Sequence, residues 1–368
     1  MLSKGDDYPI HQTPDPVAYA GNHPNFYDRY WFNGYSRDGE HFFAVALGVY
    51  PFRNVMDASF SVIHDGVQHN IHASRNLQGE RMDTRVGPLC VEVIEPLQTL
   101  RLCVEENEYD IHGEVIFQGR AKAFEEPRFR LREGTRLLWD YTRLTQSGTY
   151  SGRLQVKGQV IEVSRQRFFG TRDRSWGIRP IGDLSTQPMA NPPQPQYYWL
   201  WAPLNFEDCV TFFGVNEDAN GKPWHRSGRI MPLGDGEPLV EACPQATVVF
   251  KSGTRHVRSA VLEYPFQDGR SIGITLEPQY QFYMAGLGYM HPQWQHATYK
   301  GENVTGYDAY DLRTIDETLP IHLHVQSFCT ARMTDQEGKP KEGVGVLEQT
   351  VLGPHAPSGF KDLLDPAP

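Results

Sequence analysis

The stretch YWFNGYSRDGEHFFAVALGVY, residues 30–50, decides the fold class of this chain. Two runs of aromatic and β-branched residues flank the dipeptide Asp38-Gly39, which accepts the positive φ angles of a tight hairpin turn. In the second run the odd-numbered positions from Phe43 to Val49 are all apolar, so these side chains share one face of an extended strand. The stretch therefore predicts an antiparallel β-hairpin with one apolar face.

Similar turn signals recur in both halves of the chain. Asp65-Gly66, Asn220-Gly221 and Asp268-Gly269 each separate two apolar runs, and Gly158 lies between RLQVK and QVIEV. Closely spaced hairpins of this kind are typical of antiparallel sheets rather than of parallel crossovers. One segment, TRLLWDYTRLTQ at residues 135–146, has apolar residues at helix-like spacing. We expect an all-β fold with few short helices.

The length and the proline distribution indicate two domains. The chain has 368 residues, which fits two domains of ordinary size. The stretch GDLSTQPMANPPQPQ, residues 182–196, carries four prolines and little apolar content, as linkers do. We therefore expect a first β domain over residues 1–185 and a second over residues 186–368, each a barrel or a sandwich.

The composition excludes several classes of protein. With 35 Lys and Arg against 45 Asp and Glu, the net charge is −10, which argues against a nucleic-acid-binding protein because phosphate contacts need a basic face. No run approaches 18 consecutive apolar residues, so no membrane span is expected. The start MLSKGDDYPIHQ lacks the apolar region of a secretory signal, and we expect a cytoplasmic protein.

The spacing of cysteine and histidine predicts no metal site. The five cysteines are widely spaced without a C-x-x-C pair, and we expect buried free thiols rather than disulfides or a zinc site. His322 and His324 form an H-x-H pair on an expected strand, but no Asp or Glu follows in VQSFCTARM to complete a cupin-like set of ligands. P-loop, H-E-x-x-H and G-x-S-x-G motifs are absent. We expect no metal and no cofactor.

The densest group of charged and aromatic residues lies in FFGTRDRSWGIRP, residues 168–180. On an extended strand Asp173 faces one side while Arg172, Arg174 and Trp176 face the other, so the two neighbouring arginines need not neutralise the carboxylate. Two interpretations stay open. The group is either an arginine–aspartate network that joins two sheets, or it directs a carboxyl group into an aromatic cavity.

Three further stretches combine titratable groups with large aromatic side chains, which is unusual for a plain strand surface. They are NFYDRYWFNGY with Tyr27 and Tyr30, YPFRNVMDASF with Tyr50 and Asp57, and GYMHPQWQHATYKG with His291, Trp294 and His296. Taken singly, each residue is better explained as a buried, hydrogen-bonded core residue. Together they predict a pocket with apolar walls and a few polar groups, as is typical of small-molecule sites.

At these residues the chain resembles the carotenoid 1,2-hydratase, or hydroxyneurosporene synthase-like, superfamily, and within it an uncharacterised bacterial branch. The resemblance covers roughly residues 10–350 and rests on Arg-Asp-x-Ser-Trp-Gly (172–177), Tyr-Pro-x-Arg-Asn-Val-Met-Asp (50–57) and His-Pro-x-Trp (291–294). It implies two consecutive lipocalin-like β-barrel domains with ligands between or inside them. Characterised members of the superfamily add water to isoprenoid alkenes, relatives promote cyclisation of polyenes, and no metal or nicotinamide cofactor is implied.

The leading hypothesis is a cofactor-independent hydratase, or a related lyase or isomerase, that acts on a hydrophobic alkene such as a terpenoid. The resemblance assigns the proton donor to Asp173, although Arg174 stands where the family often has His. His291 and Asp57 are the further catalytic candidates, which would orient or deprotonate a water. The candidates for substrate binding are aromatic and histidine side chains of the four stretches: Tyr27, Tyr30, Tyr50, Trp176, Trp294 and His296.

Two alternatives stay open at this point. A lipocalin-like cavity also suits a non-catalytic carrier of an apolar molecule, and a cyclase would use the pocket mainly to fold a polyene. An aspartic acid that donates a proton near neutral pH needs a raised pKa, which burial in an aromatic cavity provides, whereas a carrier needs no such acid. In each case the partner is a hydrophobic small molecule. The sequence leaves the substrate, the direction of reaction and the oligomeric state open, a homo-oligomer included.

Overall fold

The computed structural model describes residues 3–8, 23–78, 80–181, 194–266, 268–334 and 338–368. The chain divides into two units. The first joins Met1–Leu184 to Gly286–Arg313, and the second joins Ser185–Ala285 to Thr314–Pro368. The linker expected at residues 182–196 lies outside the described residues as far as position 193.

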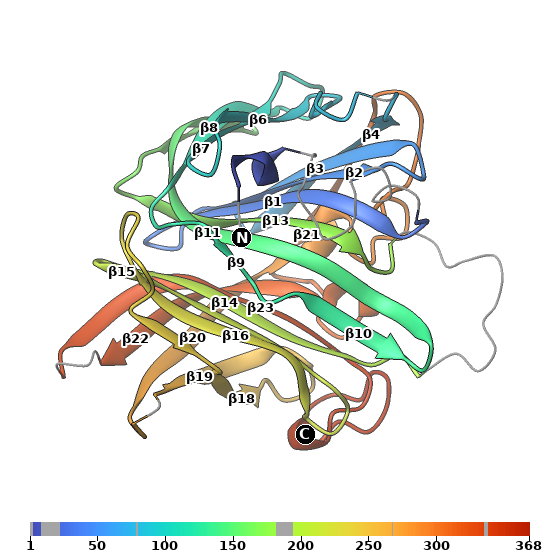
Figure 1. Cartoon of the computed structure of the whole chain (residues 1–368). Helices are drawn as coiled ribbons and strands as arrows, with labels where there is room; N and C mark the ends of the chain where they lie inside the picture. The colour runs from blue at the N-terminus through green and yellow to red at the C-terminus, as the bar shows by residue number, and fades with distance from the viewer. Residues whose placement is uncertain (1–2, 9–22, 79, 182–193, 267, 335–337) are drawn as a thin grey trace. The chain divides into compact units, whose positions relative to one another are not determined.

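Both units are built from antiparallel strands, as Figure 1 shows. Within the described ranges every helix is a 3-10 turn of three or four residues, and no α-helix is present. None of the helices in this part of the chain is long and apolar enough to cross a membrane. The all-β, lipocalin-like fold expected from the sequence is confirmed.

The first unit contains a 14-stranded sheet with the path β21-β4-β3-β2-β1-β13-β11-β8-β7-β6-β5, while β9, β10 and β12 pair with β11. Contacts of β3 with β6 and of β4 with β5 bring distant parts of this path together, so the sheet curls around its own core. Its elements are η1 (Lys4–Asp7), β1 (Phe26–Ser36), β2 (Phe42–Tyr50), β3 (Val55–His64), β4 (Val67–Asn76), β5 (Arg85–Val86), β6 (Leu89–Glu95), β7 (Thr99–Val104), β8 (Ile111–Gly119), β9 (Phe124–Glu125), β10 (Phe129–Glu133), β11 (Arg136–Val156), β12 (Gln159–Val163), β13 (Phe168–Ile178) and β21 (Val304–Asp311).

The expected turn residues form the hairpins. At Asp65-Gly66, between β3 and β4, the φ angles are 51° and 74°, and at Lys157-Gly158, between β11 and β12, they are 50° and 81°. Two successive left-handed residues make the tight turn whose twist matches that of the paired strands. Gly39, Gly221 and Gly269 also have positive φ at the other hairpins expected from the sequence.

The curled sheet of the first unit has an apolar inner face and a second face with many polar residues. The odd-numbered apolar side chains from Phe43 to Val49 are buried in the core, as expected, together with Phe60, Phe117 and Tyr150. Because side chains alternate along a strand, the even-numbered residues of β2 and the odd-numbered residues of β3 lie on the second face. The second face carries the candidate functional site.

The second unit contains a nine-stranded sheet in the order β17-β16-β15-β14-β23-β22-β20-β19-β18. Its core gathers alternate residues of the strands, such as Leu200 of β14 and Leu262 of β19. Its elements are β14 (Tyr197–Phe206), β15 (Cys209–Glu217), β16 (Pro223–Pro232), β17 (Val240–Ala242), β18 (Gln245–Phe250), β19 (Val257–Pro265), β20 (Ser271–Tyr283), η3 (Pro320–His322), β22 (Val325–Thr334), β23 (Pro340–Leu352) and η4 (Ala356–Ser358), and η2 (Met284–Leu287) spans the change from the second unit to the first.

One local pattern and one local expectation differ from the structure. The segment with helix-like spacing lies in strand β11 from its second residue onward, because pairing with β8 and β13 outweighs the local pattern. The H-x-H pair is not on a strand: His322 ends η3 and donates from Nδ1 to the carbonyl oxygen of Asp316 at 2.6 Å. His324 lies 2.7 Å from Oε1 of Glu348, a carboxylate that comes from β23 and not from the residues that follow the pair.

The expectation of free thiols is wrong for Cys90 and Cys103, which form a disulfide. The two residues lie directly opposite each other in β6 and β7, with Cα atoms 5.1 Å apart, a geometry that a spacing of 13 residues does not reveal. Cys209 and Cys329 are buried free thiols, whereas Cys243 is exposed. The cytoplasmic location stays a prediction, without support from the cysteines.

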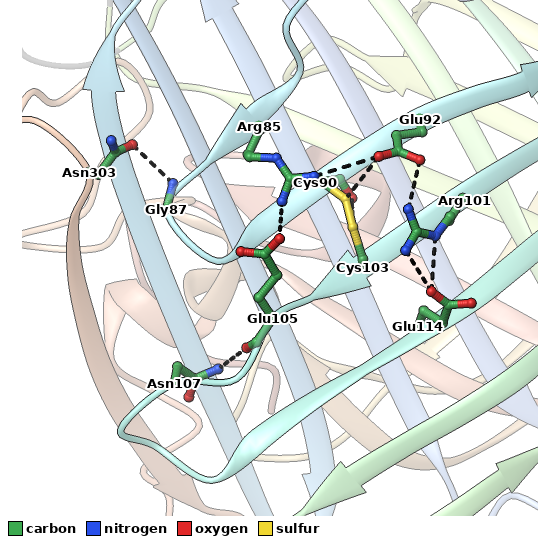
Figure 2. Close-up of polar contacts among 10 residues, drawn as sticks. All are labelled: Arg85, Gly87, Cys90, Glu92, Arg101, Cys103, Glu105, Asn107, Glu114 and Asn303. Atoms are coloured by element: carbon green, nitrogen blue, oxygen red, sulfur yellow. Dashed lines mark hydrogen bonds and ion pairs between the residues drawn. A yellow bond between two sulfur atoms is a disulfide. The ribbon is translucent and has the colours of Figure 1, made fainter.

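Charged side chains from β5 to β8 lie near the disulfide, as Figure 2 shows. Arg101 donates to Glu92 at 2.8 Å and to Glu114 at 2.7 Å, and Arg85 pairs with Glu105. These ion pairs are largely exposed, so each adds only about 0–1 kcal/mol to the free energy of unfolding. The disulfide is therefore the stronger link between β6 and β7.

Candidate functional site

Polar and aromatic side chains gather on the second face of the first unit's sheet. The strand register aligns them in cross-strand rows, and directly opposite residues in such rows lie side by side on one face. The first row crosses β11, β13, β1, β2 and β3 and consists of Arg143, Ser175, Arg29, Gly48 and Asp57. The adjacent row extends to β4 and consists of Thr145, Asp173, Trp31, Ala46, Ser59 and His72.

Asp57 combines exposure with an environment that favours its protonated form. The side chain is partly exposed, yet burial of the carboxyl group raises its pKa above the ordinary value of an aspartic acid. The hydroxyl of Tyr50 donates to Oδ1 at 3.3 Å, and the backbone N–H of Ala297 donates to Oδ2 at 2.7 Å. The guanidinium of Arg29, whose Nη1 lies 3.4 Å from the Tyr50 hydroxyl oxygen, opposes the raised pKa without cancelling it.

The loop of residues 286–297 belongs to the same unit and is anchored on this face. Ser61 and Arg29 donate to carbonyl oxygens of the loop at 3.0 and 2.8 Å, and Asp57 accepts a loop N–H from a residue 240 positions away in the sequence. The structure therefore brings the stretch around Asp57 together with the stretch around His291, as the expectation of one shared site requires.

A second polar group lies two residues further along β3, on the same face. The hydroxyl of Ser59 lies 3.1 Å from Nδ1 of His72, and Nε2 of His72 lies 3.1 Å from Oδ2 of Asp308 in β21. Nε2 of His291 lies 2.7 Å from the same oxygen, and Asn70 donates to Oδ1 at 2.6 Å. Burial disfavours the charge of Asp308, but these hydrogen bonds hold the pKa of its carboxyl well below its usual range.

The hydrogen bonds assign the proton positions on both histidines. Nδ1 of His291 accepts two backbone N–H groups of its loop, at 3.0 and 2.9 Å, so the ring proton lies on Nε2 and is donated to Asp308. Burial lowers the pKa of His72 despite the carboxylate beside it, so this ring is neutral near pH 7. His72 donates from Nε2 to Asp308, and its Nδ1 accepts the hydroxyl proton of Ser59.

His72, His291 and Asp308 could hold a metal ion by spacing, since their ligand atoms lie within 4.8 Å of one another. Their hydrogen bonds fit a metal poorly. A metal on Nε2 of His291 would leave the ring proton on Nδ1, toward which two backbone N–H groups already point. We therefore treat the three side chains as a hydrogen-bonded group and keep the metal-free site as a proposal.

Comparison with models of protein families gives one match. The model of a family described as a family of unknown function, DUF8625, matches residues 2–361. The chain belongs to DUF8625. No curated protein matches this DUF8625 chain.

Solved structures share the fold of the DUF8625 chain at low sequence identity. Kievitone hydratase from Nectria haematococca has a TM-score of 0.56 at 13% identity, over 90% of this chain and 91% of the hydratase. CghA has a TM-score of 0.51 at 9% identity over 94% of this chain and 95% of its own, and its complex with Sch210972 has a TM-score of 0.50 at 9% identity over 94% and 96%. These likenesses agree with the fold that the superfamily resemblance implies, whereas the bacterial branch stays a prediction.

Asp173 of the DUF8625 chain lies on the second face, partly exposed, but at a distance from the group around Asp57. In its row, three inter-strand spacings of roughly 4.8 Å separate it from Ser59, or about 14 Å along the sheet. Asp173 lies near Arg143: burial opposes the charge of that guanidinium, but Tyr141, Glu126 and Asp173 hold its pKa above the ordinary value. Asp173 and Asp57 therefore do not meet at one reacting bond.

Two residues expected to bind substrate lie on the other face of the sheet. Tyr30 is in the apolar core, and its hydroxyl donates to the carbonyl oxygen of Asp7. Trp176 shares the inner face of β13 with Arg172 and Arg174, as the sequence pattern indicates. Neither side chain accompanies the carboxyl groups of the second face.

The remaining expected residues lie on the second face or in its loop. The ring of Tyr27 lies 4.4 Å from the guanidinium of Arg179, and burial raises the pKa of the tyrosine to about 12. Trp294 stacks on His72, with ring centroids 5.5 Å apart and an angle of 10° between the planes. His296 donates from Nε2 to a loop carbonyl oxygen at 3.1 Å, so it holds the loop together.

Sequence reasoning missed Ser59, His72 and Asp308. They come from three strands, and no motif joins them, because their contact depends on the pairing of β3 with β4 and of β4 with β21. One signal was present in β3: Asp57, Ser59 and Ser61 alternate with apolar residues, which indicates a face that is not part of the core.

A surface depression of about 480 Å³ lies elsewhere on the first unit, beside the disulfide. Its lining includes Arg101, Glu114, Arg153 and His112. Arg101 and Glu114 pair with each other, and none of the residues expected from the sequence lines the depression. It is not the candidate site.

Proposed function

We propose that this DUF8625 protein is a cofactor-independent hydratase, or a related lyase or isomerase, that acts on an apolar alkene such as a terpenoid. One observation carries the proposal: Asp57 is a partly exposed carboxyl group whose pKa burial raises above its usual value. Protonation of a carbon–carbon double bond needs an acid that keeps its proton near neutral pH, and an upward shift of the pKa acts in that direction. The shared fold of kievitone hydratase supports the same reaction class.

In the proposed reaction Asp57 transfers its proton to one alkene carbon, and the other carbon becomes a cation. Aromatic rings beside the acid would stabilise this cation, by roughly 0.5–2 kcal/mol each. Tyr50 contacts Asp57 directly, and Trp294 packs against His72 of the adjacent row. The hydroxyl of Tyr50 also fixes the orientation of the carboxyl group.

Water would then attack the cation with help from the second polar group. Ser59 lies two residues from Asp57 on the same face of β3, or about 7 Å along the strand. Its hydroxyl can accept the proton of an attacking water while its own proton moves to Nδ1 of the neutral His72. The carboxylate of Asp308 stabilises the charged ring, and return of one proton to Asp57 completes the net addition of water.

Asp173 stays the alternative proton donor, as the superfamily resemblance implies. Its carboxylate acts on the nearby guanidinium of Arg143, so an ion-pair role competes with the role of proton donor. Asp173 and Asp57 lie too far apart to protonate the same double bond. Replacing each residue in turn therefore shows which of the two is the proton donor.

Water incorporation from H₂¹⁸O tests the proposal. The protein is incubated with a panel of acyclic and cyclic terpenoid alkenes, and ¹⁸O in the alcohol product is measured by mass spectrometry. For the alkene that the wild type hydrates, Asp57→Asn should lower the single-turnover rate at least about 100-fold, because the amide cannot donate a proton to carbon. Asp173→Asn should stay within a few-fold of the wild type.

Melting temperatures of both variants serve as the folding control, and Asp311→Asn, an exposed aspartate on β21, is the matched surface control. A rate lost only in Asp173→Asn would move the acid role to Asp173. Full activity in both variants would exclude acid catalysis at this face. Tight binding of alkenes without ¹⁸O incorporation would instead identify a carrier.

A further inference from the structure

A carboxylate-binding group lies inside the curled sheet of the first unit, on the face opposite Asp57. Arg172 of β13 and Gln146 of β11 are both fully buried, at 0% exposure, and Nε of Arg172 donates to Oε1 of Gln146 at 2.8 Å. Gln146 is held in turn because its Nε2 donates to the carbonyl oxygens of Leu97 at 2.9 Å and Ala121 at 3.0 Å. The Nη atoms of Arg172 are therefore fixed in one orientation.

The carboxylate of Asp7, from a separate part of the chain, binds these Nη atoms. Both Nη atoms of Arg172 donate to its carboxylate, Nη2 to Oδ2 at 3.3 Å and Nη1 to Oδ1. The backbone N–H of Leu97 donates to Oδ2 as well, and the Tyr30 hydroxyl donates to the backbone carbonyl of Asp7. Asp7 ends η1, a single 3-10 turn near the N-terminus, and is 0% exposed (Figure 1).

Arg172, Leu97 and Tyr30 belong to the curled sheet and its turns, whereas Asp7 belongs to η1. Leu97 lies in the turn between β6 and β7 with φ of 63°, a left-handed value that is uncommon for a residue other than glycine. Such a backbone conformation persists only where its surroundings hold it, as in ligand sites. Arg172 and Leu97 donate to the carboxylate of Asp7 and Tyr30 donates to its backbone carbonyl oxygen, and all three donors come from outside η1.

An apolar wall lies on one side of these donors. The guanidinium of Arg172 lies 5.6 Å from the ring centroid of Phe117, which belongs to the core cluster of the unit. The neighbouring cation, Arg174, is already paired with Asp28, so only one positive charge is available to a ligand. One such cation beside the apolar core matches a monocarboxylate with a hydrocarbon tail better than a phosphate dianion.

We propose that Arg172, Leu97 and Tyr30 form a binding site for the carboxylate of an apolar acid, a fatty acid in its simplest form, and that Asp7 occupies this site as an internal competitor. Lipocalin-type barrels hold one small ligand, and in this proposal the ligand takes the space that η1 leaves when Asp7 is displaced. The site is separate from the proposed catalytic face, because inner and second-face residues point to opposite sides of the same strands.

Competition for the site is tested with the full chain. Binding of decanoic acid and of 1-decanol is measured by displacement of cis-parinaric acid fluorescence. Asp7→Ala should bind decanoic acid at least ten-fold more tightly than the wild type, and should bind 1-decanol at least ten-fold more weakly than the acid. The double variant Asp7→Ala/Arg172→Gln should lose the preference for the acid. Asp38→Ala, which removes an exposed carboxylate paired with Arg167, is the control and should behave as the wild type.

Melting temperature gives a second readout, because Asp7→Ala leaves the buried guanidinium of Arg172 without its carboxylate. Decanoic acid should raise the melting temperature of Asp7→Ala and leave those of the wild type and the double variant almost unchanged. Equal affinity of wild type and Asp7→Ala for the acid would overturn the proposal. Equal binding of acid and alcohol by Asp7→Ala, or failure of this variant to fold even with decanoic acid present, would overturn it as well.

Discussion

The Nε2 atom of His291 lies 2.7 Å from the Oδ2 atom of Asp308 and joins the loop of residues 286–297 to strand β21. The same carboxylate accepts a hydrogen bond from Nε2 of His72 in β4 at 3.1 Å and another from Nδ2 of Asn70 at 2.6 Å. Three donors on one partly buried carboxylate explain why its pKa lies well below the usual range. Asp308 therefore couples the loop to the sheet.

Asp308→Asn should lower the free energy of unfolding by about 2–3 kcal/mol at pH 7, because the amide cannot accept all three hydrogen bonds and carries no charge. A carboxyl with a lowered folded-state pKa stabilises the protein above its unfolded pKa of about 3.9, and this contribution is lost as the pH falls further. The difference from the wild type should thus be constant between pH 7 and pH 5 and shrink below pH 4. Urea denaturation at several pH values measures it.

Asp311→Asn on the same strand is the matched control for this prediction. The side chain of Asp311 is 38% exposed and pairs with Arg313 two residues further on, so its replacement should leave the unfolding midpoint unchanged. If Asp308→Asn were as stable as this control, Asp308 would not be the link between the loop and the sheet.

The fold could be predicted from the sequence because its signals are local. Each Asp-Gly or Asn-Gly pair requires only its own φ angles, and the alternation in β2 requires only neighbouring residues. The helix-like spacing of residues 135–146 does not indicate the structure, because long-range contacts decide it. Strand β11 is 21 residues long and pairs with several strands, and these contacts override the local spacing.

The candidate site could be predicted only in part. Asp57 and His291 were found through short motifs, whereas Ser59 and His72 meet because residues 13 positions apart lie opposite each other in β3 and β4. Tyr30 was assigned to the site because composition does not say which side of a strand faces the core. The disulfide was missed for a similar reason, since its formation depends on the register of two strands.

Gly48→Ala tests whether Tyr50 must lie against Asp57. A Cβ atom at Gly48 would lie 2.3 Å from the hydroxyl oxygen of Tyr50, whose ring is fully buried, so the ring would have to move away from Asp57. We expect a loss of about 1–3 kcal/mol in stability, as for other overpacked sites, and a lower hydration rate. Gly273→Ala in β20, where nothing lies within 4 Å of the added atom, is the control. A fully active Gly48→Ala would show that the contact is dispensable.

His69 should make the protein sensitive to moderate acid. Burial, and to a lesser degree the charge of Lys157, lower the pKa of His69 to about 4 from the usual 6.5 of a histidine. A histidine with a lowered pKa takes up its proton in the unfolded state first, so stability falls as the pH drops from 6.5 and the loss is complete near pH 4. His69→Gln should therefore show a smaller decrease in melting temperature over this interval than the wild type. An equally steep decrease in both proteins would contradict the assignment.

The Cys90–Cys103 disulfide should contribute to stability mainly by restricting the unfolded chain. Closing a loop of 13 residues is worth about 3 kcal/mol in the chain-entropy model. The double variant Cys90→Ser/Cys103→Ser should lose about that much and should no longer respond to reductant, whereas the wild type should lose stability when dithiothreitol is added. Cys243→Ser, which removes an exposed free thiol, should leave both measurements unchanged. Mass spectrometry of a non-reduced digest would identify the peptide pair directly. Its absence, together with an unchanged unfolding midpoint in reductant, would show that β6 and β7 pair without the covalent link, held by their backbone hydrogen bonds and the ion pair of Arg101 with Glu92.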